Sequence, residues 1–195
     1  MNNQSCPDDY DVFLSYAHTD DIGGIVPALH EQLESDFQRL LQRPVELFLD
    51  RSDIRGFDDW KVRCHRALRA SRFFIVLLSP AYLTSDACRW EWEEWIKREL
   101  EHGQVGTGAA CLWFIEIARL DAPGDIERLR QWKNELRRRF GVAFHAWREG
   151  GREALQDTAA RTELARLTDH VAQRLRLLAL DRGQRGNLGW PQDRF

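Results

Sequence analysis

The stretch Arg72-Phe-Phe-Ile-Val-Leu-Leu78, followed by Ser79-Pro-Ala-Tyr-Leu-Thr-Ser-Asp-Ala-Cys-Arg-Trp-Glu91, decides the fold of this chain. Residues 72–78 form a continuous apolar run, which is typical of a parallel strand covered on both faces. The residues that follow lead into a helix predicted from about Ser85 to His102, which carries Glu91 in its first turns. Ligands of open α/β sheets bind just beyond the carboxyl ends of the strands. The sequence therefore places this carboxylate where a binding site is expected.

Four further strands and four further helices are predicted around this segment. The strands are expected at residues 10–16, 45–50, 109–117 and 141–147. The helices are expected at residues 22–41, 60–68, 125–139 and 164–178. Strands that alternate with helices imply a parallel sheet with right-handed crossovers and helices on both faces. We therefore predict one α/β domain with five parallel strands.

The length of 195 residues suits one domain with short ends. We place this domain at residues 10–180, after an N-terminal extension at 1–9. Residues 181–195 are rich in glycine and arginine and are predicted to form a flexible C-terminal tail. The domain boundary is therefore expected at the end of the last helix.

Composition narrows the classes of function. The net charge of -3 and the pI of about 6.1 argue against a dedicated nucleic-acid-binding protein, which would carry a basic stripe. The basic run Arg137-Arg138-Arg139 is short, and we interpret it as a solvated helix end. Residues 1–9 lack the features of a secretory signal, and no apolar run approaches the roughly 20 residues of a membrane helix. We expect a cytoplasmic protein that enters no membrane.

The cysteines and histidines show no spacing that indicates a metal site. The chain has four cysteines, at positions Cys6, Cys64, Cys88 and Cys111. No two of them form a CxxC pair, so a zinc site is not expected. Reduced thiols in a cytosolic protein are the simplest interpretation.

Helical geometry singles out Glu91 among the acidic residues of its helix. At about 100° per residue, Glu91 lies beside Cys88 on the flank of the buried face, whereas Glu93 and Glu94 project toward solvent. Glu99 faces inward, but it lies two turns further from the end of the strand. Helix physics alone also allows a plain structural role, in which Glu91 interacts favourably with the helix dipole.

The order of these segments resembles the Toll/interleukin-1 receptor (TIR) domain family over roughly residues 10–175. The resemblance rests on four strings, namely Tyr10-Asp-Val-Phe-Leu-Ser-Tyr16, Leu47-Phe-Leu-Asp50 with Gly56 and Trp60, Phe73–Pro80 with Tyr82, Ser85, Cys88 and Glu91, and Phe144-His-Ala-Trp147. They resemble the first box, the second strand with its mobile loop, the approach to the glutamate helix and the third box. The resemblance implies the TIR fold, a flavodoxin-like five-stranded parallel sheet with helices on both faces.

In some members of the TIR family the matching glutamate cleaves NAD. The resemblance thus implies that Glu91 is the catalytic residue of an NAD+ glycohydrolase, which yields ADP-ribose or a cyclic form of it. One carboxylate beside the ribose is chemically sufficient, because the transition state carries positive charge on the sugar and nicotinamide leaves as a neutral base. The Rossmann glycine fingerprint is absent, so NAD is expected as a substrate and not as a redox cofactor.

The predicted substrate-binding residues lie at strand ends, in the loop after the second strand and on the glutamate helix. They are Ser15, Tyr16, Ala17, His18, Asp50, Arg51, Phe57, Trp60 and Cys88. Ser15 and Tyr16 could bond ribose or phosphate oxygens, or could simply pack the end of the strand. Asp50 could bond a ribose hydroxyl or open the loop as an Asx turn, and Arg51 could pair with a pyrophosphate or stay solvated. The loop aromatic residues either line the pocket or pack the loop on the second helix.

Two departures from the family pattern keep a second function open. Ala87 stands where members of the family often carry tryptophan, and Trp90 and Trp92 have a different helical phase. Ala17 and His18 stand where enzymatic members can carry arginine. The alternative is a non-enzymatic interaction module, in which the loop at residues 51–60 and the adjacent helices dock other TIR domains.

Partners and setting follow from the resemblance. It implies self-association, contact with other TIR proteins or a separate sensor, and a role in bacterial innate immunity, including antiviral defence.

A nucleoside deoxyribosyltransferase-like enzyme is a third interpretation of the function, made weaker by the first-box and third-box strings. A phosphoacceptor receiver domain is excluded, because Ser15-Tyr16 occupies the place of its acidic pair.

Overall fold

The computed structural model of the chain describes residues 10–49, 57–101, 112–118, 139–145 and 147–186, with positions 120, 132, 134 and 136. Within these ranges only the backbone is described at residues 57–60, 148–149 and 178–186. The predicted helix at 125–139 lies almost wholly outside the described residues, as do residues 1–9 and 187–195.

The centre of the fold is a five-stranded parallel sheet with the order β2-β1-β3-β4-β5. Its strands are β1 (Val12–Ser15), β2 (Leu47–Leu49), β3 (Phe73–Leu78), β4 (Leu112–Glu116) and β5 (Gly141–Ala143). This is the flavodoxin-like order, so the predicted fold class is confirmed. Every residue of β1 and β3 is buried, as the apolar run at 72–78 predicted. The strand order reverses between these two strands, which defines the topological switch point of the sheet.

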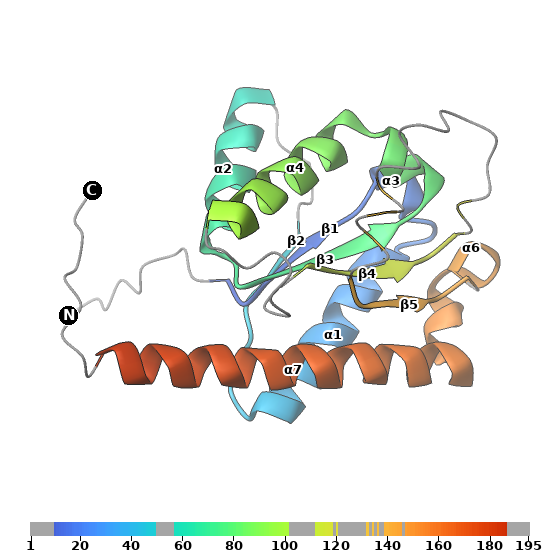
Figure 1. Cartoon of the computed structure of the whole chain (residues 1–195). Coiled ribbons are helices and arrows are strands. Elements are labelled where there is room, and N and C mark those ends of the chain that lie inside the picture. The colour runs from blue at the N-terminus through green and yellow to red at the C-terminus, as the bar shows by residue number, and fades with distance from the viewer. Residues whose placement is uncertain are drawn as a thin grey trace, which may run out of the picture.

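Helices cover both faces of the sheet (Figure 1). Helices α2 (Phe57–Ala70) and α4 (Asp86–Glu101) cover one face, and α1 (Ile25–Leu41) and α7 (Thr158–Gly186) cover the other. Shorter elements complete the chain: η1 (His18–Asp20), α3 (Pro80–Thr84), α6 (Trp147–Gly150) and η2 (Gly151–Gln156). The two layers of helices enclose the apolar strands, which form the core.

Local chemistry explains where the helices near β1 and β3 begin. Gly24 precedes α1 with a left-handed backbone (φ 74°), a conformation that glycine adopts without strain. The Asp21 side chain then accepts a hydrogen bond from the Val26 amide at 3.0 Å. Ser79 caps α3, because its Oγ accepts from the Tyr82 amide at 2.9 Å, and Pro80 takes the first helical position. Sequence reasoning did not predict α3 as a separate helix.

The predicted end of the fifth strand is wrong, and the last helix is longer than predicted. The fifth strand ends at Ala143, and Trp147 begins α6 instead of ending a strand. The last helix begins at Thr158 and continues to Gly186, so the boundary predicted at residue 180 falls within a helix. The part of the predicted tail at residues 181–186 is therefore helical.

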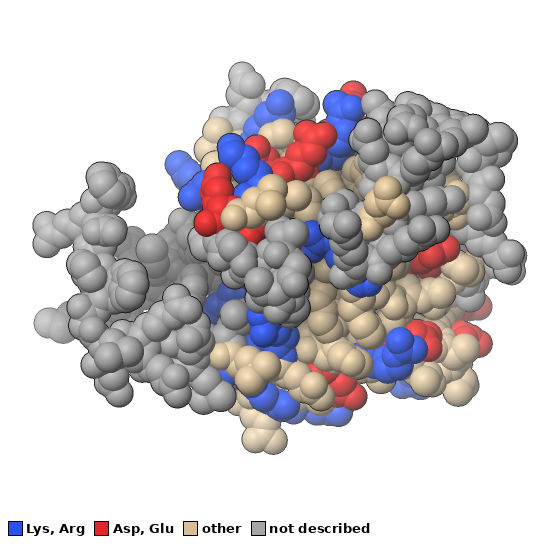
Figure 2. Space-filling model, viewed as in Figure 1, with Lys and Arg blue, Asp and Glu red and all other residues tan. Residues whose placement is uncertain are grey.

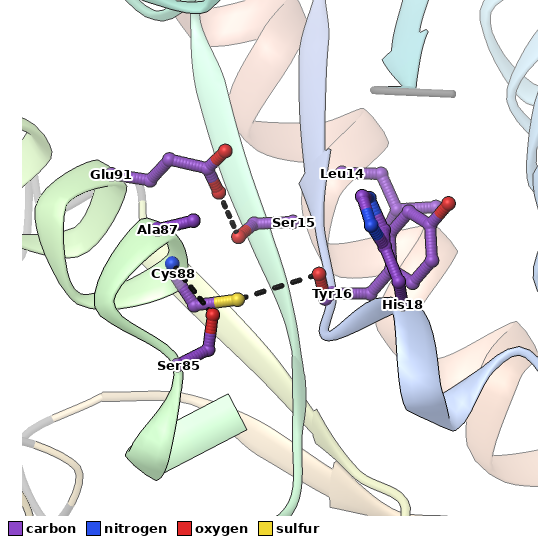
Figure 3. A pocket seen from close by; sticks show the side chains of 8 residues that line it. All are labelled: Leu14, Ser15, Tyr16, His18, Ser85, Ala87, Cys88 and Glu91. Carbon is purple, nitrogen blue, oxygen red and sulfur yellow. Dashed lines mark hydrogen bonds between the residues drawn. The ribbon is translucent and has the colours of Figure 1, made fainter. Parts of the chain in front are cut away.

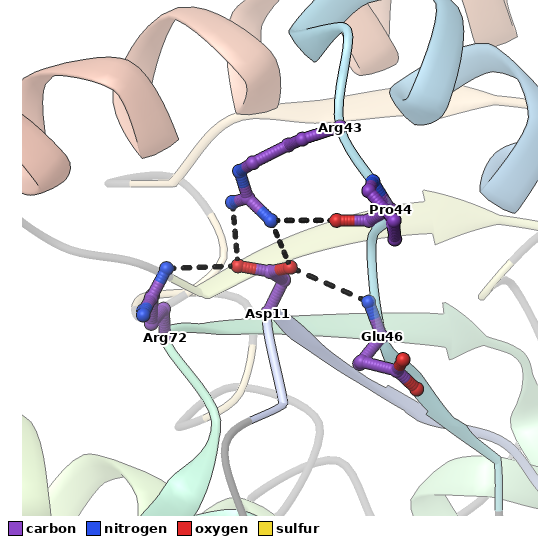
Figure 4. A network of polar contacts seen from close by, with 5 residues as sticks. All are labelled: Asp11, Arg43, Pro44, Glu46 and Arg72. Carbon is purple, nitrogen blue, oxygen red and sulfur yellow. Dashed lines mark hydrogen bonds and ion pairs between the residues drawn. The ribbon is translucent and has the colours of Figure 1, made fainter. Parts of the chain in front are cut away.

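The amino end of the sheet is fastened by a buried carboxylate (Figure 4). Asp11 accepts two hydrogen bonds of 2.8 Å from the Arg43 guanidinium and one of 3.0 Å from Arg72. The backbone amide of Glu46 also donates to it at 3.3 Å. These bonds raise the pKa of Arg43, chiefly through the hydrogen bond to Asp11. The start of β1 is thus tied to the segments that lead into β2 and β3.

A second buried ion pair corrects the interpretation of the arginine run. Arg139 Nη2 lies 2.7 Å from Glu99 Oε2, and the two side chains are 3% and 1% exposed. Trp95 Nε1 donates to the other oxygen of Glu99 at 3.0 Å. The side chain of Arg139 is therefore buried and is not part of a solvated helix end.

The surface carries charges of both signs. Figure 2 shows Lys and Arg side chains interspersed with Asp and Glu over α4 and along α7 on the face in view. Among the helices of the described residues, none combines the length and apolar character required to cross a bilayer.

Candidate active site

A cavity opens at the carboxyl end of β1, beside the switch point of the sheet. Its enclosed volume is about 50 Å³, or about 350 Å³ with the open space at its mouth, and it is lined by Leu14, Ser15, Tyr16, His18, Ser85, Ala87, Cys88 and Glu91. Figure 3 shows that these residues come from the end of β1, the turn after it and the first turns of α4. The cavity thus lies where open α/β sheets bind ligands.

Glu91 projects from α4 toward the end of β1 (Figure 3). Its side chain is 5% exposed, and Ser15 Oγ donates a hydrogen bond to its Oε2. The orientation of α4 is fixed by its apolar face, because Trp95 stacks on Phe74 of β3 with ring centroids 5.1 Å apart. The structure therefore brings together Glu91 and Ser15, two predicted site residues that are 76 positions apart in the sequence.

Tyr82 lies behind these two residues. Its hydroxyl is 2.9 Å from Ser15 Oγ, and its side chain is fully buried. Burial, followed by the nearby charges of Cys88 and Glu91, raises the pKa of the Tyr82 phenol well above its ordinary value. Sequence reasoning included Tyr82 in a family string but gave it no role. The feature of the sequence that could have pointed to Tyr82 is a tyrosine hydroxyl shortly after the predicted strand at residues 72–78.

Cys88 forms the wall of the cavity between Glu91 and the end of β1. Its thiol donates to the Tyr16 carbonyl at 3.4 Å, and its amide donates to Ser85 Oγ at 3.3 Å. Burial first, and the charge of Glu91 second, raise the pKa of the Cys88 thiol to about 12. A thiol that stays protonated is a poor nucleophile.

The residues after β1 lie on the other side of the strand from Glu91. Figure 3 shows the rings of Tyr16 and His18 side by side, with centroids 5.3 Å apart. Both residues line the cavity, whereas Ala17 is buried and is not among its lining residues. Two aromatic rings therefore border the cavity opposite the carboxylate.

The predicted contacts from the loop after β2 stay predictions. Asp50 and Arg51 lie outside the described residues, and Phe57 and Trp60 belong to the part of α2 whose side chains are not described.

Ala87 lines the cavity at the position where the resemblance leads one to look for an aromatic ring. Neither neighbouring tryptophan takes its place. Trp92 packs on Trp132 with centroids 4.4 Å apart, and Trp90 lies near His65. The α4 side of the cavity therefore carries a methyl group at Ala87 and no aromatic ring.

A second buried carboxylate lies near the cavity and was not singled out by the sequence. Asp20 is 2% exposed, and its Oδ2 accepts a hydrogen bond of 2.5 Å from Ser79 Oγ. Its carbonyl oxygen accepts from Trp147 Nε1 at 2.9 Å. Its neighbour Asp21 accepts a hydrogen bond from the Val26 amide at the start of α1. Asp20 instead joins the turn after β1 to the end of β3 and to α6.

In the part of the chain that the structure describes, no group of three or more His, Cys, Asp or Glu side chains is placed to hold a metal ion. What the site offers is a buried carboxylate, hydroxyl groups and aromatic rings around a small cavity.

Comparison with known proteins identifies the family. The family model of the TIR domain matches residues 12–107. The chain is 32% identical over 133 residues to the NAD(+) hydrolase ApTIR of Actinoplanes sp., a match that covers 68% of this chain and 18% of that protein. The chain thus spans about a fifth of the length of that relative.

Two solved structures show a weaker likeness. One is the TIR domain of the Toll-related receptor TRR-2 from Hydra magnipapillata, with a TM-score of 0.42 and 18% identity over 66% of this chain and 96% of that one. The other is the TIR domains of the activated Roq1 resistosome, with a TM-score of 0.42 and 16% identity over 85% of this chain and 84% of that one. Residues 12–107, which the family model matches and which include the whole wall of the cavity, therefore belong to the TIR domain family.

Proposed function

We propose that this protein is an NAD+ glycohydrolase in which Glu91 is the catalytic residue. The observation that carries the proposal is a buried carboxylate that is held by Ser15 and lines a cavity at the switch point of the sheet. A relative that is 32% identical over 133 residues is named as an NAD(+) hydrolase, which supports the same substrate.

The reaction that fits this site breaks the bond between nicotinamide and ribose. The bonding electron pair leaves with the nicotinamide nitrogen, and positive charge develops on the ribose. The Glu91 carboxylate stabilises this charge or attacks the anomeric carbon. Water then adds to that carbon and loses a proton, which gives ADP-ribose. Attack by the adenine ring of the same molecule in place of water gives a cyclic product.

The size of the cavity sets how NAD+ could bind. The enclosed volume of about 50 Å³ lies far below the range of typical small-molecule sites, about 300–1,000 Å³. A cavity of this size does not enclose the nicotinamide riboside end, so NAD+ would lie across its mouth and along the rim, where Tyr16 and His18 lie. Self-association of TIR domains would supply further walls. We propose that the protein works as an assembly in the bacterial cytoplasm, in immunity that includes antiviral defence.

A second function, a non-enzymatic TIR interaction module, is favoured by one observation. Ala87 leaves the α4 wall of the cavity without an aromatic ring that could stack on a base. In this case Glu91 would have a structural role, and the protein would act by docking other TIR domains or a separate sensor.

The deciding experiment measures nicotinamide release from NAD+ by chromatography, with purified protein in dilute solution and after assembly is forced by crowding. We expect turnover by the natural sequence and a loss of about a thousandfold or more in Glu91→Gln. Glu93→Gln is the matched control, because Glu93 lies on the same helix with its side chain 66% exposed. Equal rates in the natural sequence and Glu91→Gln, or no release in any assembled form, would favour the interaction module.

A further inference from the structure

A buried chain of hydroxyl groups stands behind the catalytic carboxylate. Tyr82 is fully buried, Ser15 is 2% exposed and Glu91 is 5% exposed. The Tyr82 hydroxyl lies 2.9 Å from Ser15 Oγ, which in turn donates to Glu91 Oε2. The three residues come from α3, β1 and α4, so the chain crosses the switch point of the sheet.

The number of available hydrogens determines which group donates in each of these hydrogen bonds. A serine hydroxyl has one hydrogen to donate, and an ionised carboxylate only accepts. Since Ser15 donates to Glu91, the bond between Tyr82 and Ser15 must use the hydrogen of Tyr82. The other acceptor near Tyr82 is the Cys88 carbonyl at 3.5 Å, which is long for a hydroxyl donor. The raised pKa of the Tyr82 phenol keeps its hydrogen in place.

Tyr82 itself is firmly placed. Its amide donates to Ser79 Oγ at 2.9 Å, and Ser79 Oγ donates to Asp20 Oδ2 at 2.5 Å. Its ring meets Trp132 edge-on, with centroids 6.0 Å apart. Because the backbone and the ring of Tyr82 are both held in place, its hydroxyl can orient a neighbouring group more precisely than a side chain on a loop can. Linked hydrogen bonds in a buried site also strengthen one another.

We infer that Tyr82 is a positioning residue for Glu91, acting through Ser15. Its hydroxyl directs the Ser15 hydrogen at the carboxylate and so fixes the orientation of Glu91 toward the cavity. This inference rests on the proposed NAD+ cleavage, and its test therefore includes a measurement that needs no turnover.

The kinetic test is a double-variant cycle of Tyr82→Phe and Ser15→Ala. We expect Tyr82→Phe to lower kcat for NAD+ cleavage about tenfold while KM changes less than about twofold, because one charge-linked hydrogen bond is weakened. Ser15→Ala should lose at least as much. If Tyr82 acts through Ser15, the double variant should be no slower than Ser15→Ala alone. If the loss in the double variant equalled the product of the two single losses, the inference would be overturned.

Matched controls lie at the other end of β1. Tyr10→Phe removes a tyrosine hydroxyl next to β1, where the ring of Tyr10 meets Phe48. Ser71→Ala removes a buried serine hydroxyl that bonds the Ala67 carbonyl at 2.7 Å just before β3. Neither variant should change kcat by more than about twofold.

The second measurement follows the Glu91 carboxyl by NMR in protein labelled with 13C-glutamate, with the signal assigned by its loss in Glu91→Gln. The titration midpoint should move to higher pH in Tyr82→Phe and in Ser15→Ala, because the ionised carboxylate loses donor strength. An unmoved midpoint in both variants refutes the inference. Absence of NAD+ cleavage in the natural sequence, with a moved midpoint, would refute the proposed activity and leave the hydrogen-bond chain established.

Discussion

A buried carboxylate lies at each end of β1, and the two carboxylates have different partners. At the amino end, Asp11 accepts from the guanidinium groups of Arg43 and Arg72 and from a backbone amide. At the carboxyl end, Glu91 accepts from the hydroxyl of Ser15 and lines a cavity. A carboxylate wrapped by cations has its charge compensated and serves as an anchor. A carboxylate that borders a cavity can interact with positive charge on a bound ligand.

Removing the anchor should have the largest effect on stability. Asp11→Ala leaves two guanidinium groups without their shared partner, and we expect the free energy of unfolding to fall by about 3 kcal/mol. Urea denaturation measures this change, and NAD+ cleavage per folded molecule should be retained.

Glu163→Ala is the control for Asp11→Ala. Glu163 pairs with Arg166 at 3.1 Å on the surface of α7, where both side chains are partly exposed. A surface pair of this kind should contribute less than about 0.5 kcal/mol. If both variants lost the same stability, the contrast between a buried anchor and a surface pair would not hold.

The charge of Glu91 should be detectable through its neighbour Cys88. The Cys88 thiol has a pKa of about 12, against an ordinary value of 9.0, so less thiolate is present at pH 8 than in a free cysteine. In a variant that keeps Cys88 as its single cysteine, alkylation at pH 8 should be about a thousandfold slower than after unfolding, because the thiolate fraction is lower by about that factor. Glu91→Gln should speed it, because the charge that raises this pKa is removed.

The same pKa has a consequence for stability. In the unfolded chain the thiol ionises near pH 9, whereas in the folded protein it stays protonated until about pH 12. This contribution to stability is complete below about pH 9 and is lost as the pH rises toward 12. Alkylation as fast in the folded as in the unfolded protein would show that Cys88 is not shielded by burial and by Glu91.

Neutralising the carboxylate of Glu91 that lines the cavity should have the smallest effect on stability. In Glu91→Gln the side chain keeps its volume, its amide oxygen can still accept from Ser15, and no charge is buried. We expect the free energy of unfolding to change by less than about 1 kcal/mol, in the stabilising direction. Thermal unfolding of both proteins at one pH measures this difference. A destabilisation as large as that of Asp11→Ala would make Glu91 a second anchor.

The sequence predicted the parts of the fold that depend on local patterns. The apolar run before Ser79 predicted β3, and the helical phase of Glu91 placed it beside Cys88 on the flank of the buried face. Ser15 was expected at the end of β1, and the structure brings it to Glu91.

Features that depend on distant partners were missed or misjudged. Arg139 looked solvated, because its partner Glu99 lies 40 positions earlier in the sequence and only the tertiary fold brings the two together. The hydroxyl of Tyr82 and the carboxylate of Asp20 find their partners across the switch point of the sheet. A one-dimensional pattern does not contain such pairings.

The shortness of β1 has a mechanical consequence. Four residues, about 13 Å of extended chain, separate the anchored end of the strand from the end that meets the cavity. Successive side chains point to opposite faces, so a slip of one position would bring Leu14 or Tyr16 to the place of Ser15. The contacts of Asp11 at one end of β1 thus help to set the register that brings the Ser15 hydroxyl to Glu91 at the other end.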